Sequence, residues 1–155
     1  VVHFTPDELL TQRQHILGAA DFWMTESAAR VRADVSLNIT VNFVNAGQPL
    51  TVPDAGVPIK GDFDVIPAIL PDPDNGGYTD ALALLDPAYA GLSPNAAARR
   101  FNHDTREAFG ADFAWTTFVR PYEPETADAR VYGPNVNAYL DSNLFVHAHE
   151  AAHIF

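Results

Sequence analysis

The chain has 155 residues, of which 47% are hydrophobic and 19% are charged. This length and composition suit one domain with a buried core. Twenty acidic residues oppose nine basic ones, so the surface field is negative, which disfavours nucleic acids and anionic membranes as partners. The sequence contains no Cys, which excludes disulfides and thiolate ligands and leaves His and carboxylate groups as the metal donors.

The sequence has no run of about 18 apolar residues and no charged start followed by an apolar segment. We therefore predict neither a membrane span nor a signal peptide within these residues. Because the chain begins at Val1 without an initiator Met and ends within a helical pattern, we expect it to be a piece of a longer protein. A signal peptide of that protein would precede Val1.

Residues 5–26 carry the signals of a long amphipathic helix. Thr5 is the predicted N-cap, Pro6 takes the first helical position, and Glu8 stands three residues after the cap, as in a capping box. Apolar residues at helical spacing are predicted to face the core: Leu9, Leu10, Ile16, Leu17, Ala20, Trp23 and Met24. The opposite side is predicted to carry Asp7, Gln12, Gln14 and Asp21.

Residues 35–43 alternate between apolar and polar side chains, which predicts a strand with one solvent-facing side. The following segment, 46–78, is rich in Pro, Gly and Asp, and we predict loop with an edge strand within 63–70. Its acidic run at 72–77 is predicted to be a solvated turn, with an irregular Ca²⁺ site as the alternative. An EF-hand is excluded because Ala83 occupies the position that needs Glu.

Two helices and two strands are predicted next. A short helix spans 79–85, and a clearer one runs from Ser93 to Gly110 with an inner face made of Ala97, Ala98, Phe101, Thr105 and Ala108. The aromatic and β-branched run 113–119 predicts a strand buried on both sides, and 131–140 predicts an irregular segment or edge strand. These elements predict an α+β fold with a mixed twisted sheet and packed helices.

The last twelve residues contain the spacing H-E-x-x-H, at His149, Glu150 and His153. Residues four apart lie about 40° apart around a helix, so both imidazoles can reach one Zn²⁺. Glu150 then stands beside the metal, where its carboxylate can take a proton from a metal-bound water as a general base. Chance would produce this pattern in roughly one such chain in a hundred.

The rest of this segment fits a helix with one buried side. Asp141, Ser142 and Asn143 are the candidate N-caps. The side away from the metal is mostly apolar, with Leu144, His147, Ala148, Ala151, Ile154 and Phe155. His147 is predicted to be a core histidine with a hydrogen-bonded ring. On a strand, His147 and His149 would instead share a face and form a metal-binding pair, but the alanines favour a helix.

The segment 148–155 resembles the active-site helix of the zincin metallopeptidases, and secreted metzincin-type enzymes most. The resemblance implies His149 and His153 as zinc ligands, Glu150 as the general base, and a third ligand beyond Phe155. It also implies a secreted or extracytoplasmic protein. Residues 1–155 would be the N-terminal part of a single, incomplete catalytic domain, in which 135–140 forms the edge strand that pairs with an extended substrate.

The predicted function is therefore zinc-dependent hydrolysis of peptide bonds, with a polypeptide as substrate. Because catalytic zinc usually has three protein ligands, we predict weak zinc binding and no turnover from residues 1–155 alone. His103 is the one distant candidate for a third donor within the chain. Two alternatives remain: a catalytically inactive secreted binding module on the same fold, and a different metal hydrolase that uses His147 and His149.

Overall fold

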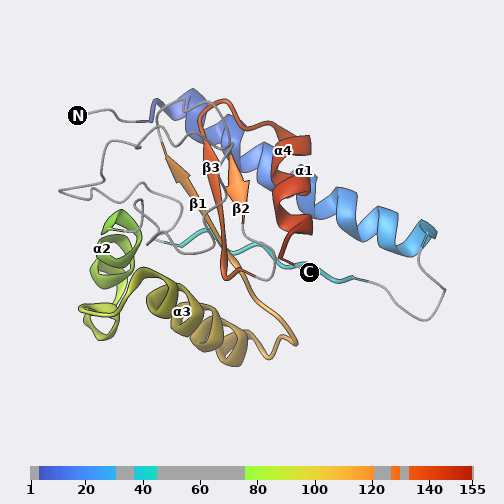
Figure 1. Cartoon of the computed structure of the whole chain (residues 1–155). Coiled ribbons are helices and arrows are strands. Elements are labelled where there is room, and N and C mark those ends of the chain that lie inside the picture. Colours follow the sequence, from blue (N-terminus) through green and yellow to red (C-terminus); the bar gives the residue numbers. More distant parts are fainter. Residues whose placement is uncertain (1–3, 31–36, 45–75, 121–126, 130–132, 155) are drawn as a thin grey trace, which may run out of the picture. The chain divides into compact units, whose positions relative to one another are not determined.

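The computed structural model describes residues 4–30, 37–44, 76–120, 127–129 and 133–154 (Figure 1). Its helices and strands confirm the prediction of a mixed α+β protein. The chain divides into two compact units, one made of residues 1–47 and 117–155 and the other of residues 48–116. The predicted edge strand within 63–70 and most of the candidate Ca²⁺ run at 72–77 lie outside the described residues. The prediction of a single catalytic domain stays a prediction.

The first unit begins with helix α1, Pro6–Arg30, which extends a turn beyond its predicted end. The predicted capping box is confirmed: the backbone N–H of Thr5 donates to Glu8 Oε2 at 2.6 Å, and the N–H of Glu8 donates to Thr5 Oγ1 at 3.3 Å. These two bonds satisfy backbone donors that the helix itself leaves without partners. Local sequence signals therefore determine where α1 starts.

The buried side of α1 differs from the predicted one. Gln12, expected on the polar side, is only 4% exposed, whereas Leu10 and Leu17, expected in the core, are 56% and 48% exposed. Ala19, Ala20 and Ser27 share the buried side with Gln12. Leu10 and Leu17 lie about 140–160° around the helix from Gln12. Apolar residues therefore lie on two different sides of α1. The segments that pack against α1 bury only one of these sides.

The main partner of α1 is the last helix, α4, Leu144–Ala152 (Figure 1). Gly18 permits their close approach, because a Cβ atom at this position would stand 2.5 Å from Leu144 Cδ1. One turn and a half further along α1, Trp23 Nε1 donates to the carbonyl oxygen of Ala148 at 2.9 Å. The C-terminal helix is therefore attached to α1 along its length.

Residues 37–43 correct the strand predicted at 35–43, because they have no regular secondary structure. The predicted alternation of sides is present: Leu37, Ile39, Val41 and Phe43 are half-buried, and Asn38, Thr40 and Asn42 are exposed. The segment contacts α1, where the N–H of Leu37 donates to Ser27 Oγ at 3.1 Å and the Arg13 guanidinium lies 5.6 Å from the Phe43 ring centre. Alternation indicates which side is covered, and here a helix provides the cover.

The described sheet has three strands, β1 Thr116–Arg120, β2 Asp128–Ala129 and β3 Asn135–Tyr139, in the order β1-β3-β2. Strands β2 and β3 are antiparallel, with Asp128 opposite Asn137, and β1 runs in the same direction as β3 (Figure 1). The sheet is therefore mixed, as predicted.

One predicted strand placement and one predicted strand burial were wrong. The segment 135–140, predicted at an edge, contains the middle strand β3, in which Val136 and Ala138 are each 1% exposed. The run 113–119, predicted as a strand buried on both sides, contains β1, but all its side chains are half-buried or exposed, and Phe113 is 50% exposed. Within β3, Asn135 Nδ2 donates to Asn137 Oδ1 at 2.8 Å, and this bond partly offsets the cost of burying Asn137.

The second unit contains α2 Gly76–Leu85, the 3₁₀ turn η2 Pro87–Tyr89 and α3 Pro94–Phe109. Both predicted ends of α3 are confirmed, with Ser93 as N-cap and Gly110 in the left-handed conformation at φ 60°. Ala97 and Ala98 form the buried centre of its inner side, at 0% and 1% exposure. Ala108, predicted on that side, is exposed.

Tyr89 is expected to make the second unit sensitive to alkaline pH. Its side chain is buried and its hydroxyl donates to Asp104 Oδ2 at 2.9 Å. Burial, followed by the hydrogen bond and charge of Asp104, raises the pKa of Tyr89 from 10.0 to about 12. The unfolded chain therefore loses this proton first, so the stabilisation is complete below pH 10 and declines between pH 10 and 12.

Urea unfolding across that pH range, followed by circular dichroism, measures the decline. Tyr89→Phe is expected to cost about 1 kcal/mol at neutral pH, because it loses the hydrogen bond, and to flatten the alkaline dependence. An equal alkaline decline in Tyr89→Phe would contradict the assignment.

Candidate metal centre

Helix α4 carries His149 and Glu150 of the H-E-x-x-H residues, His153 is its C-cap, and Asn143 is its N-cap. The side chain of this N-cap accepts hydrogen bonds at Oδ1 from the N–H groups of Phe145 at 2.9 Å and Val146 at 3.2 Å. Asn143 was one of the three predicted caps. The inward side of the helix is also confirmed, with His147, Ala148, Ala151 and Ile154 between 3% and 6% exposed. Leu144 is half-buried, and Phe155 lies outside the described residues.

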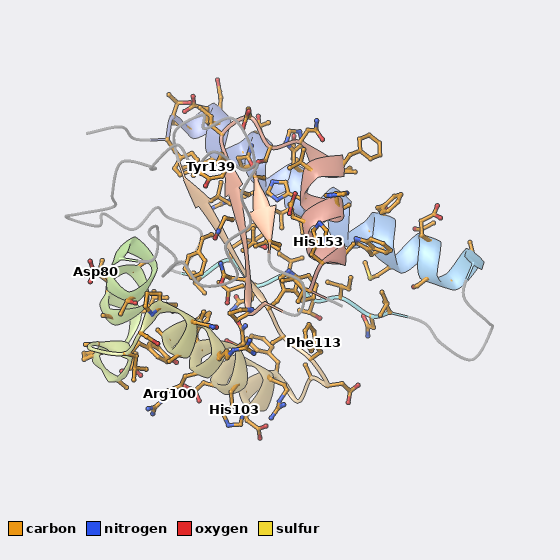
Figure 2. All side chains as sticks on the ribbon, in the orientation of Figure 1. Asp80, Arg100, His103, Phe113, Tyr139 and His153 are labelled. Carbon is orange, nitrogen blue, oxygen red and sulfur yellow. The ribbon has the colours of Figure 1, made fainter. Side chains whose placement is uncertain are left out.

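The outward side of α4 brings His149, Glu150 and His153 together, with one donor atom from each lying within 4.8 Å of the other two. The Nε2 atoms of His149 and His153 are 3.3 Å apart, and their ring planes are inclined by 86° (His153 is labelled in Figure 2). His149 is exposed, His153 half-buried, and Glu150 9% exposed. The two nitrogen donors are therefore open to solvent, while the carboxylate is largely covered.

These distances fit a zinc ion. Two nitrogens at about 2.0–2.1 Å from one tetrahedral Zn²⁺ stand roughly 3.3–3.4 Å apart. The Nε2 separation of 3.3 Å is thus that of a ligand pair, and in the metal-free protein it also allows one ring N–H to donate to the other nitrogen. In the described part of the chain, no other group of three His, Asp or Glu side chains gathers closely enough to hold a metal.

His147 lies on the opposite side of α4. It is 4% exposed, and its Nε2 stands 3.0 Å from Gln12 Oε1, which confirms the predicted core histidine with a hydrogen-bonded ring. Burial, and secondarily the neighbouring His15, lower the pKa of His147 to about 4. Because 144–152 is helical, His147 and His149 diverge by about 200°, so the strand-based metal pair is wrong.

His103, the predicted distant donor, lies on α3 in the second unit (Figure 2). It is exposed, and its Nδ1 stands 3.1 Å from Arg106 Nη2 on the same helix. It does not belong to the described group of donors on α4. The third ligand predicted beyond Phe155 stays a prediction.

Sequence reasoning missed Gln12 and His15, which reach the turn before α4 from α1. Gln12 Nε2 donates to the carbonyl oxygens of Leu140 and Ser142, and His15 Nδ1 stands 3.0 Å from the Ser142 oxygen. A signal was present: Gln12 falls at helical spacing with Ile16, Ala20 and Trp23, on the apolar side of α1. A polar residue in that register indicates a buried hydrogen-bonding partner.

Comparison with known proteins finds no matching family model, no matching characterised protein and no matching solved structure. Among the described helices, none combines the length and apolar character that crossing a bilayer requires. The functional interpretation therefore depends on the α4 residues and their surroundings alone.

Proposed function

We propose that this chain carries the metal-binding helix of a zinc-dependent metallopeptidase. One observation carries the proposal: two imidazole Nε2 atoms 3.3 Å apart, with the Glu150 carboxylate within 4.8 Å of both donors. The spacing of these residues and the amphipathic helix that presents them support it further.

The chemistry divides between the ion and the chain. Zinc, when bound, supplies a Lewis acid that polarises a carbonyl and lowers the pKa of a coordinated water toward 7. His149 and His153 would hold the ion through Nε2. Glu150 would accept the proton of the attacking water at a carboxylate oxygen and pass it to the nitrogen of the leaving amine. Its low exposure limits competition from bulk water for the same carboxylate.

We propose a polypeptide as the substrate and a secreted or extracytoplasmic location, because both are implied by the resemblance to zincins. The prediction that 135–140 pairs with an extended substrate is wrong. Strand β3 lies between β1 and β2, so its backbone donors and acceptors are directed to two neighbouring strands. An extended substrate cannot add to a strand that is already flanked on both sides.

Zinc titration of residues 1–155 tests the metal site. We expect weak binding by the wild type, and His149→Ala and His153→Ala are each expected to weaken it by at least about tenfold, since one imidazole remains. His103→Ala, which removes an exposed histidine from α3, is the matched control and is expected to bind like the wild type.

Competition with a chromophoric chelator gives the four affinities, and circular dichroism checks that each variant is folded. Equal affinities in all four proteins would contradict the site. Tight one-to-one binding by the wild type would contradict the prediction that the third ligand lies beyond Phe155. A folded natural protein that retains no zinc after gentle dialysis would favour the alternative of an inactive binding module.

A further inference from the structure

The side chain of Gln12 is buried between α1 and the start of α4, and all its polar atoms contact that region. Its Nε2 donates to the carbonyl oxygen of Leu140 at 2.8 Å and to that of Ser142 at 3.1 Å. Its Oε1 stands 3.0 Å from His147 Nε2. The side chain is 4% exposed, so water offers little replacement for these bonds.

The chemistry of these partners determines the proton on His147. A carbonyl oxygen only accepts, so the amide nitrogen of Gln12 must face Leu140 and Ser142, and its oxygen must face His147. That oxygen also only accepts, so His147 is the donor and carries its proton on Nε2. Its other ring nitrogen, Nδ1, is buried without a hydrogen-bond partner. Gln12 is therefore the contact that specifies the ring tautomer of His147.

The turn that Gln12 holds leads directly into the metal helix. Within it, the N–H of Ser142 donates to the Tyr139 oxygen at 3.0 Å, and Ser142 Oγ accepts from the N–H of Tyr139 at 3.0 Å. His15 adds a contact from α1, with Nδ1 at 3.0 Å from the Ser142 oxygen. The N-cap Asn143 follows at once. Gln12 thus contacts α4 both at its entry and, through His147, at the end of its first turn.

We propose that Gln12 is a positioning residue for the metal centre, which sets the rotation of α4 about its axis. With His147 held inward, His149, about 200° further around, must face outward, and His153 follows on the same side. The inference rests on the proposed function, since it concerns the same site. It assigns to α1 a part in the geometry of a metal pair made of His149 on α4 and His153 at the C-cap of α4.

The test compares Co²⁺ binding by the wild type, Gln12→Leu and Ser27→Ala. Gln12→Leu keeps a similar size and loses all three hydrogen bonds. Ser27, 5% exposed on the same helix, bonds only to Met24 and Leu37 among the contacts described for it, so Ser27→Ala is the matched buried control away from α4. The d–d absorption of Co²⁺ gives both the affinity and the coordination geometry.

Gln12→Leu is expected to bind Co²⁺ about tenfold more weakly, with an altered d–d spectrum, under conditions in which it is fully folded. Ser27→Ala is expected to match the wild type in both. If Gln12→Leu does not fold, Gln12→Glu replaces it. This variant keeps the acceptor for His147, loses the two donors to Leu140 and Ser142, and is also expected to bind more weakly than the wild type.

Nitrogen-detected NMR of the histidine rings is the second measurement, and a neutral His147 with its proton on Nε2 is expected. Wild-type protein that binds no Co²⁺ would contradict the proposed function. Wild-type binding that depends on His149 and His153, together with unchanged affinity and spectrum in the folded Gln12 variant, would overturn this inference alone. A His147 proton on Nδ1 would also overturn it.

Discussion

Glu150→Gln is expected to lower peptide hydrolysis by the natural protein about 10²–10⁴-fold while its zinc content stays unchanged. The amide keeps the size of the carboxylate but cannot accept a proton, so the attacking water is no longer deprotonated. The two imidazoles, with Nε2 atoms 3.3 Å apart, do not depend on this carboxylate to face one ion. Cleavage of a fluorogenic peptide mixture measures the rate, and atomic emission measures the zinc.

Glu107→Gln is the matched control for this substitution. Glu107 is an exposed carboxylate on α3 that pairs with Arg106, at 2.8 Å from its Nη2. Its loss is expected to leave hydrolysis unchanged. Undiminished hydrolysis by Glu150→Gln would sink the assignment of the base. Loss of zinc from Glu150→Gln would show instead that Glu150 is a ligand, a role its position within 4.8 Å of both histidines also permits.

The second large effect is expected on stability in acid. Protonation of the buried His147 should lower the free energy of unfolding of the metal-free protein. Burial first, and the nearby His15 second, lower the pKa of His147 from 6.5 to about 4. The unfolded chain therefore takes up this proton before the folded one does. The stabilisation is complete above pH 6.5 and is lost as the pH falls toward 4, by about 3 kcal/mol in the free energy of unfolding.

Urea unfolding of the chelator-treated protein at a series of pH values measures this loss. His147→Gln is the informative variant, because its amide can still donate to Gln12 Oε1 and has no charge to gain. The difference between the two curves therefore gives the contribution of His147 together with its interaction with His15. Parallel curves across this interval would contradict the prediction.

The ends and types of the helices were predictable because their signals are local. The capping box of Thr5 and Glu8, the left-handed Gly110 and the N-cap before α4 each act within a few residues of the chain. The same holds for the candidate metal-binding pair, because two histidines four apart converge whenever their segment is helical. The helix ends and the histidine pair could therefore be predicted without knowing which distant segments pack against these helices.

The sheet order and the buried side of α1 could not be predicted in this way. β3 occupies the middle of the described sheet although its segment was predicted at an edge, and Leu10 is exposed although its spacing suggested the core. Burial of a residue depends on which distant segment packs against it, and a polar residue can be buried wherever that segment satisfies its hydrogen bonds.

Contacts between residues of one helical segment were therefore predictable from the sequence. Contacts between residues of two different helices were not. The sequence by itself determined that His149 and Glu150 on α4 and His153 at its C-cap lie on one side, because helical geometry follows from spacing alone. Only the tertiary structure decided that Gln12, 135 residues before His147, would hold that helix from the other side. Its amide needs three partners in fixed directions, and only the packing of α1 against α4 brings them together.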